Sequence, residues 1–135
     1  MSLSADDRLD ILDLIGRADA YATRRDADAY ASLFTDDAVL DGSQGRHPAA
    51  ELRLSVGPIW AAEGPATLHL TLNPVIDHGA GPDEAVVSSI LLIVDPAGAA
   101  SPISIRTVAS ITQVVRRVGG TWRIARRTVG QAGAG

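Results

Sequence analysis

Cysteine and lysine are both absent from this chain of 135 residues, and aromatic residues make up only 4% of it. Without cysteine there is no disulfide, no thiolate nucleophile and no cysteine-bound zinc. Without lysine there is no Schiff base on a side-chain amine and no phosphate-loop lysine. The lack of cysteine fits a reducing compartment, so we expect a cytoplasmic protein. The arginine-only, alanine-rich composition is typical of a GC-rich bacterial genome.

Long apolar runs are also missing, since none approaches the roughly 20 residues that a membrane-spanning helix needs. The first residues are acidic and lack the apolar stretch of a signal peptide. A formal net charge of −4 argues against duplex nucleic acid, and we expect neither nucleic acid nor a membrane as partner. The length predicts one domain over residues 1–130 and a flexible tail over residues 131–135.

The beginning of the chain has helical periodicity. Ser4 is a good N-cap, and apolar residues at helical spacing predict a helix over residues 5–24. A short second helix is expected over residues 26–34, capped by Asp26. Thr35-Asp36-Asp37 then predicts a turn.

A short strand and a third helix are expected next. The strand covers residues 39–41 and ends in a glycine-containing turn. Pro48 favours the first turn of a helix over residues 47–56, which Gly57-Pro58 should break or kink.

The second half of the chain alternates between apolar and polar residues, as strands do. We expect a meander of four strands over residues 67–76, 85–94, 103–117 and 122–129, with Pro74 at a sheet edge or a bulge. One face of the third of these strands carries Ile103, Ile105, Ala109, Ile111 and Val115. Helices followed by such a meander predict an α+β fold, in which a curved antiparallel sheet wraps around N-terminal helices as an open cone.

Four segments in this order carry a resemblance to a known family: residues 17–26, 30–39, 67–76 and 120–129. They resemble the SnoaL-like group of the nuclear transport factor 2-like superfamily, which includes scytalone dehydratase, ketosteroid isomerase and polyketide cyclases. The resemblance implies a cystatin-like roll with a hydrophobic pocket. It also implies a homo-oligomer, a dimer or a trimer, formed through the sheet.

His69 is the most informative polar residue, because it lies in an alternating strand with Thr67, Thr71 and Asn73 on its side and leucines on the other. If that side faces the cone, an imidazole enters the pocket and can move a proton near pH 7. A histidine at the matching position of scytalone dehydratase is catalytic. The alternative is a structural or exposed histidine.

The family pattern then calls for a carboxylate late in the first helix, and Thr23 stands at that position. Threonine is no carboxylate base, so dehydration of the scytalone type is in doubt. Asp19 borders the apolar stripe of the first helix and, if desolvated, becomes a candidate base. Asp41, at the end of the short strand, is a second candidate. For both, a side chain that reaches water is the alternative.

Candidate substrate-binding residues come from several predicted elements: Tyr21, Thr23, Tyr30, Trp60 and Asn73. A tyrosine can donate a hydrogen bond to a substrate carbonyl, although aromatics at helical spacing more often belong to the core. His47 and His78 are expected to be exposed, and the three histidines have no metal-ligand spacing. We therefore expect neither a metal nor a cofactor.

Two pairs of adjacent arginines, Arg116-Arg117 and Arg126-Arg127, lie on the last two predicted strands. We expect them to alternate between faces and to meet acidic side chains or a partner subunit, with a small anionic ligand as an alternative.

Two functions compete. The first is a cofactor-free lyase, isomerase or cyclase that acts on a hydrophobic small molecule with His69 as acid and base. The second is a non-catalytic binding or assembly module that resembles the small subunit of ring-hydroxylating dioxygenases. A cavity that brings His69 within hydrogen-bond reach of a carboxylate would favour the enzyme.

Overall fold

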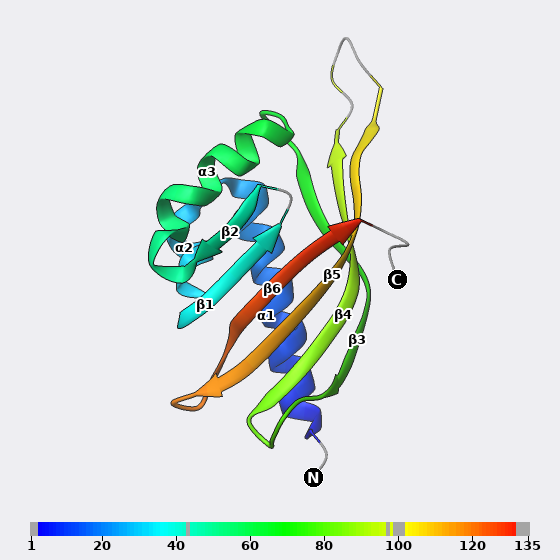
Figure 1. The fold of residues 1–135 in the computed structure, drawn as a ribbon. Coiled ribbons are helices and arrows are strands. Elements are labelled where there is room, and N and C mark those ends of the chain that lie inside the picture. Colours follow the sequence, from blue (N-terminus) through cyan, green and yellow to red (C-terminus); the bar gives the residue numbers. More distant parts are fainter. Residues whose placement is uncertain (1–2, 43, 97, 99–101, 132–135) are drawn as a thin grey trace.

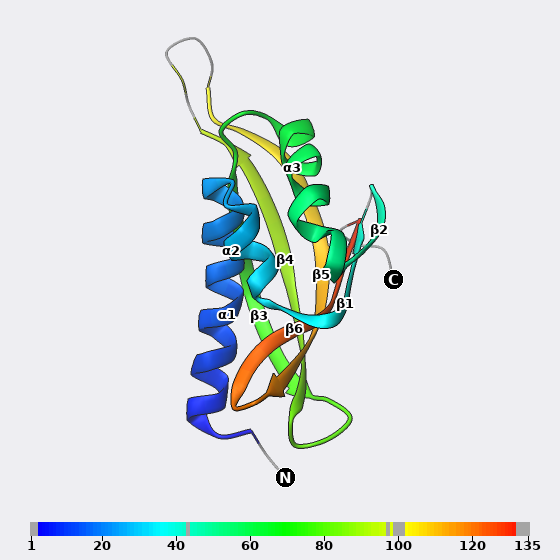
Figure 2. The ribbon, with the colours of Figure 1, turned by 90° about the vertical axis from the view of Figure 1, so that its left-hand side faces the viewer.

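The computed structural model describes residues 3–42, 44–96, 98 and 102–131. Three helices pack against a curved, unclosed sheet of six strands in the order β2-β1-β6-β5-β4-β3 (Figure 1). Helix α1 runs along one face of the sheet, and α2 and α3 cover the same side nearer one end (Figure 2). The predicted α+β fold is thereby confirmed.

The helices begin where the sequence places strong caps. Helix α1 spans Ala5–Arg24, and its first turn is closed by a reciprocal pair of hydrogen bonds between Ser4 and Asp7. Helix α2 is short, Ala27–Ser32, and the Asp26 side chain accepts the Ala29 N–H at 3.1 Å as its N-cap. Both predicted caps are confirmed.

The third helix differs from the prediction. His47 and Pro48 belong to strand β2 (Gly45–Pro48), a 3₁₀ turn covers Ala49–Glu51, and α3 runs over Leu52–Glu63. Of the break or kink expected at Gly57-Pro58, the break was wrong, because the helix continues through Pro58, which lies on its exposed side. Burial of the opposite face outweighs the cost of a mid-helix proline, about 3 kcal/mol.

Strand β1 spans Phe34–Gly42, so the turn predicted at Thr35–Asp37 was wrong. The segment lies in the strand at a place where its register against β6 shifts. Strand β1 pairs with β6 in parallel, which makes the sheet mixed rather than wholly antiparallel. The helical segment between β2 and β3 then leads the chain across to the far edge of the sheet.

The remaining strands form the expected antiparallel meander, β3 (Leu68–His78), β4 (Glu84–Asp95), β5 (Ser104–Val118) and β6 (Thr121–Gln131). Strand β3 is an edge strand with a bulge around Pro74, as predicted. Of the predicted apolar face of β5, Ala109, Ile111 and Val115 are buried, but Ile105 is exposed. A register shift of β5 against β4 next to Ile105 reverses the alternation.

Ile103 was predicted within this strand and on the same face, but it precedes β5 and is exposed. Of the predicted C-terminal tail, Gln131 is the last residue of β6, and residues 132–135 lie outside the described part of the chain. None of the helices in the described part of the chain is long and apolar enough to span a membrane.

Candidate active site

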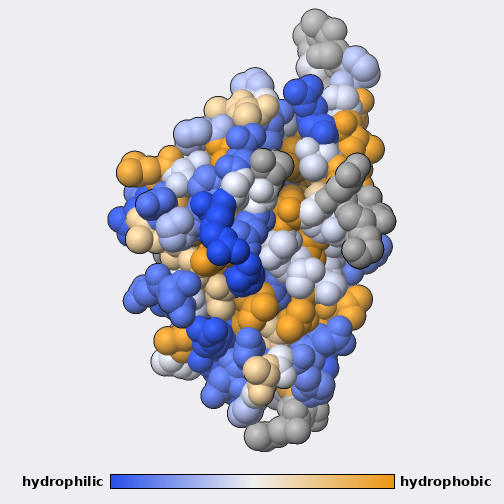
Figure 3. All heavy atoms as spheres, viewed as in Figure 1, coloured by the Kyte–Doolittle hydropathy of each residue, from blue (hydrophilic) through white to orange (hydrophobic). Residues whose placement is uncertain are grey.

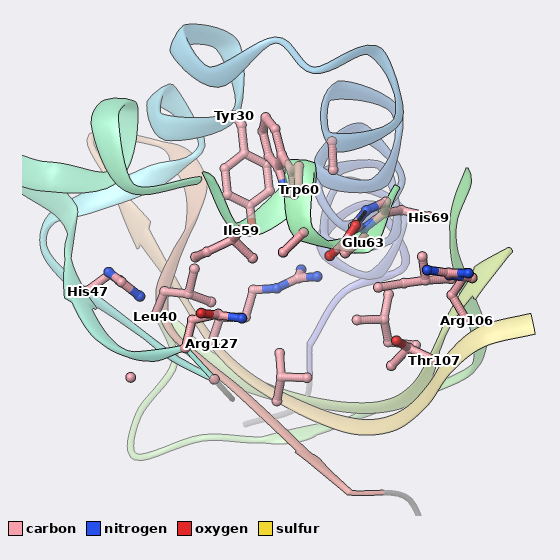
Figure 4. Close-up of a pocket in the computed structure, with 18 residues that line it drawn as sticks. Tyr30, Leu40, His47, Ile59, Trp60, Glu63, His69, Arg106, Thr107 and Arg127 are labelled. Atoms are coloured by element: carbon pink, nitrogen blue, oxygen red, sulfur yellow. Dashed lines mark hydrogen bonds and ion pairs between the residues drawn. The ribbon is translucent and has the colours of Figure 1, made fainter. Parts of the chain in front are cut away.

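An open cavity of about 300 Å³ lies between α3 and the inner face of the sheet (Figure 4). Apolar side chains form much of its wall, among them Leu40, Ile59, Trp60, Leu91, Ile93 and Val129. Its polar lining consists of Tyr30, Gln44, His47, Glu63, His69, Arg106, Thr107 and Arg127. A volume of this size, with a few polar groups in an apolar wall, suits a small organic ligand.

His69 and Glu63 face each other in this cavity and are joined by a hydrogen bond. The imidazole Nε2 lies 2.7 Å from Glu63 Oε2. His69 is 6% exposed, and only 15% of the Glu63 side chain is accessible. The polar side of β3 therefore faces inward, with Thr67 buried beside it, while the leucines of this strand face out.

Glu63 was missed by the sequence reasoning because the third helix was expected to end before it. In the observed helix, Glu63 lies three residues after Trp60 and seven after Val56. This spacing places all three on one face of the helix. The helix thus supplies a carboxylate to the cavity, whereas the family pattern places one late in the first helix.

Thr23 occupies that position in the first helix and has a different contact. Its hydroxyl accepts a hydrogen bond from the backbone N–H of His69 at 2.9 Å. Strand β3 is an edge strand, and this bond attaches it to α1. Thr23 does not line the cavity, but it fixes the backbone that carries the imidazole.

A bulge in β6 decides which of two adjacent arginines faces the cavity. The register of β6 against β5 shifts between Ile124 and Arg126, which inserts Ala125 as an extra residue. Since side chains alternate along a strand, the insertion turns Arg127 inward. Arg127 is 4% exposed, while Arg126 faces out and forms an ion pair with Asp41 at 2.5 Å.

The expectation that the arginine pairs meet acidic side chains holds for three of the four. Besides Arg126, Arg116 lies 3.6 Å from Asp37, and Arg117 bridges Asp7 and Asp83 at 2.7 and 2.8 Å. Arg127 is the exception. Its Nη1 donates to the buried amide oxygen of Gln113 at 3.1 Å.

Tyr30 enters the cavity from α2 and packs edge-on against Trp60, with ring centroids 5.2 Å apart (Figure 4). Burial raises the pKa of the Tyr30 phenol above its ordinary value, and the carboxylates of Asp19 and Glu63 add to this while Arg127 opposes it. The phenol is therefore a neutral hydrogen-bond donor at neutral pH. Of the predicted substrate-binding residues, Tyr30 and Trp60 line the cavity.

The other predicted site residues lie outside the cavity lining. Asp19 is buried on α1 with no hydrogen-bond partner for its Oδ1 among the described residues, and Asp41 is held between Arg46 and Arg126 on the far side of the strand. Tyr21 is only partly buried on α1 and does not line the cavity. Asn73 is exposed at the bulge of β3, where its φ is 54°.

His47 was expected to be exposed but lines the cavity from β2, with its Nε2 buried and unpartnered. His78, at the end of β3, is exposed as expected. Among the described residues, no group of three or more histidine and acidic side chains is placed to hold a metal ion.

The family model of the SnoaL-like domain matches residues 4–128. The chain belongs to this family. No curated protein sequence matches it significantly. The predicted resemblance to SnoaL-like proteins is thus confirmed.

Solved structures share the SnoaL-like fold along nearly the whole chain. A protein of unknown function with a cystatin-like fold from Nostoc punctiforme is 25% identical, with a TM-score of 0.84 over 96% of this chain and 93% of that chain. ActVI-ORFA from Streptomyces coelicolor is 15% identical, with a TM-score of 0.84 over 98% and 99% of the two chains. A candidate scytalone dehydratase from Novosphingobium aromaticivorans is 17% identical, with a TM-score of 0.77 over 96% and 95%.

Proposed function

We propose that this SnoaL-like protein is a cofactor-independent enzyme that moves a proton on a hydrophobic small molecule, as a lyase, isomerase or cyclase does. The observation that carries the proposal is the 2.7 Å contact of His69 Nε2 with Glu63 Oε2 inside a ligand-sized cavity. A buried carboxylate beside an imidazole is the arrangement that orients a histidine for general acid–base catalysis.

The charge of Glu63 assigns a role to each nitrogen of the ring. An ionised Glu63 only accepts, so Nε2 carries the hydrogen and Nδ1 keeps the lone pair that takes a proton from the substrate. When Nδ1 is protonated, the Glu63 carboxylate stabilises the imidazolium. Tyr30 supplies a neutral donor for a carbonyl oxygen on which negative charge develops.

Exchange of carbon-bound hydrogen tests this function without knowledge of the natural substrate. Cyclic ketones and polyketide-like β-diketones are incubated with the protein in D₂O, and deuterium at the carbon next to the carbonyl is followed by NMR. We expect exchange above the buffer rate with the wild type and its loss in His69→Ala. His78→Ala, which changes an exposed histidine, is the control. If no compound exchanges, or if His69→Ala exchanges as fast as the wild type, the proposal is wrong.

The alternative, a binding or assembly module, is supported by the outer face of the sheet. Register pairs Leu70 with Leu92 and Leu92 with Val108, and these three face away from α1 as one apolar row. Leu70 is 40% exposed and Val108 is 46% exposed. Figure 3, which views this face, shows apolar surface over the half of the molecule where β4 and β5 run.

We propose that a second copy of the chain covers this row, as the resemblance implies. Size-exclusion chromatography with light scattering should give a homo-oligomer for the wild type and a monomer for Val108→Glu. Leu54→Glu, at an exposed apolar position on α3 and away from the sheet, serves as the control. A monomeric wild type would contradict self-association.

A further inference from the structure

Arg127 is a buried cation with no direct counter-charge among the described residues. Its side chain is 4% exposed, and its hydrogen bond goes to the neutral amide of Gln113. None of the ion pairs within 4.0 Å between described residues includes Arg127. A guanidinium has five N–H donors, so most of its donor capacity is unused by those residues.

Removing a cation from water is costly unless it is paired. The neighbouring Arg126 differs in this respect. It lies on the outer side of the strand and forms an ion pair with Asp41 at 2.5 Å. The bulge turns the unpaired arginine of the two toward the cavity. In Figure 4 the Arg127 side chain lies across the cavity, on the side opposite Tyr30.

The charges around Arg127 leave the cavity lining with an excess of positive charge. Arg106 also lines the cavity, from β5. Glu63 is the carboxylate of the lining, and its Oε2 is bonded to His69. Asp19 lies close enough to influence Tyr30 but does not line the cavity.

We propose that the cavity binds an organic carboxylate with an apolar body, and that Arg127 forms a bidentate pair with the carboxylate. A planar guanidinium matches a carboxylate in this way and holds it in one orientation. The apolar body packs against Trp60 and Ile59. His47, with its buried and unpartnered Nε2, supplies a further polar contact at the same cavity.

This inference deepens the proposed function by naming the class of substrate, and it rests on that function only for the reaction at His69. Anion binding itself requires Arg127 and the cavity. Because Arg127, Glu63 and His69 line the same cavity, a molecule held by its carboxylate at Arg127 occupies the space that the imidazole faces.

Calorimetric titration with 2-naphthoate and its neutral isostere 2-naphthamide tests the anion site. We expect the wild type to bind the carboxylate at least tenfold more tightly than the amide. Arg127→Met should abolish this preference, and Arg127→Lys should keep part of it. Arg126→Met is the matched control and should keep the wild-type preference. Circular dichroism of each variant verifies that it is folded.

Three results would overturn the inference: equal affinity for the two probes, an equal effect of Arg126→Met and Arg127→Met, or no binding of either probe at millimolar concentration. If Arg127→Met does not fold, Arg127→Lys still tests the inference, because lysine keeps the positive charge and should keep part of the preference for the carboxylate.

The results distinguish a failure of the carboxylate inference from a failure of the proposed enzyme function. If 2-naphthoate binds in an Arg127-dependent way while no ketone exchanges deuterium, the anion site stands and the enzyme proposal falls. If neutral ketones exchange at a rate that depends on His69 and not on Arg127, the enzyme proposal stands and the carboxylate inference falls.

Discussion

The hydroxyl of Thr23 in α1 accepts the backbone N–H of His69 in β3 at 2.9 Å, which attaches the edge of the sheet to the first helix at the residue that carries the imidazole. Edge strands otherwise leave such N–H groups unpaired. The contact therefore links the stability of the edge strand to the position of His69.

Replacement of Thr23 by valine keeps the shape of the side chain and removes the acceptor. We expect the free energy of unfolding to fall by about 1–2 kcal/mol, because a half-buried N–H loses its partner. Urea denaturation measures the change. Thr23→Ser, which keeps the hydroxyl, should lose less, and an equal loss in both variants would mean that the hydrogen bond is not the cause.

The tautomer of His69 is a second prediction. We expect ¹⁵N NMR to show the hydrogen on Nε2 in the wild type, because Glu63 Oε2 lies 2.7 Å from that nitrogen and an ionised carboxylate only accepts. In Glu63→Leu the spectrum should change toward a mixture of tautomers. A wild-type spectrum with the hydrogen on Nδ1 would contradict the roles assigned to the two nitrogens.

The buried phenol of Tyr30 should make the folded protein less stable at alkaline pH. Its pKa is raised by burial in the folded protein, whereas the unfolded chain has the ordinary value near 10. The stability that comes from the neutral buried phenol is complete below pH 10 and is lost as the pH rises toward the folded-state pKa. Tyr30→Phe lacks this loss. The wild type should therefore lose more stability than Tyr30→Phe between about pH 8 and pH 11 in urea titrations, and equal losses would contradict the assignment.

Asp41 was a candidate base, and its surroundings predict a structural role instead. Hydrogen bonding from Arg46, with the charges of Arg46 and Arg126, lowers the pKa of its carboxyl. Its contribution to stability is therefore present above the ordinary pKa near 4 and is lost as the pH falls through the lower folded-state value. Asp41→Asn should be less stable than the wild type at pH 7, and this difference should shrink in acid.

Catalytic activity separates the two roles of Asp41. Because Asp41 does not line the cavity, deuterium exchange by Asp41→Asn should match that of the wild type at pH 7. A large loss of exchange in a folded variant would restore Asp41 as a candidate base.

The sequence predicts those features of the fold and the site that depend on residues close together in the chain. The bounds of α1 and the cap at Asp26 depend on neighbours within one helical turn, and the sequence predicts both. Alternation along a single strand places His69 on the face opposite the leucines, but the sequence left open which of the two faces points inward, and the packing of the sheet decides it.

The rest of the site depends on features that local patterns do not reveal. Glu63 reaches the cavity only because α3 continues through Gly57-Pro58, and tertiary burial of Val56 and Trp60 decides that. Arg127 faces inward only because the pairing of β5 with β6 inserts one residue. A single insertion reverses the alternation of everything beyond it, so the sequence could not tell Arg126 from Arg127.

A double-mutant cycle on the rate of deuterium exchange tests the central claim that His69 and Glu63 act as one acid–base unit. We expect His69→Gln to lower the rate by at least about 100-fold, within the usual contribution of general acid–base catalysis. Glu63→Gln should lower it by less, and the double variant should be no slower than His69→Gln alone, because residues that act as a unit are non-additive. Independent, multiplicative losses, or a His69→Gln variant as fast as the wild type, would contradict the account.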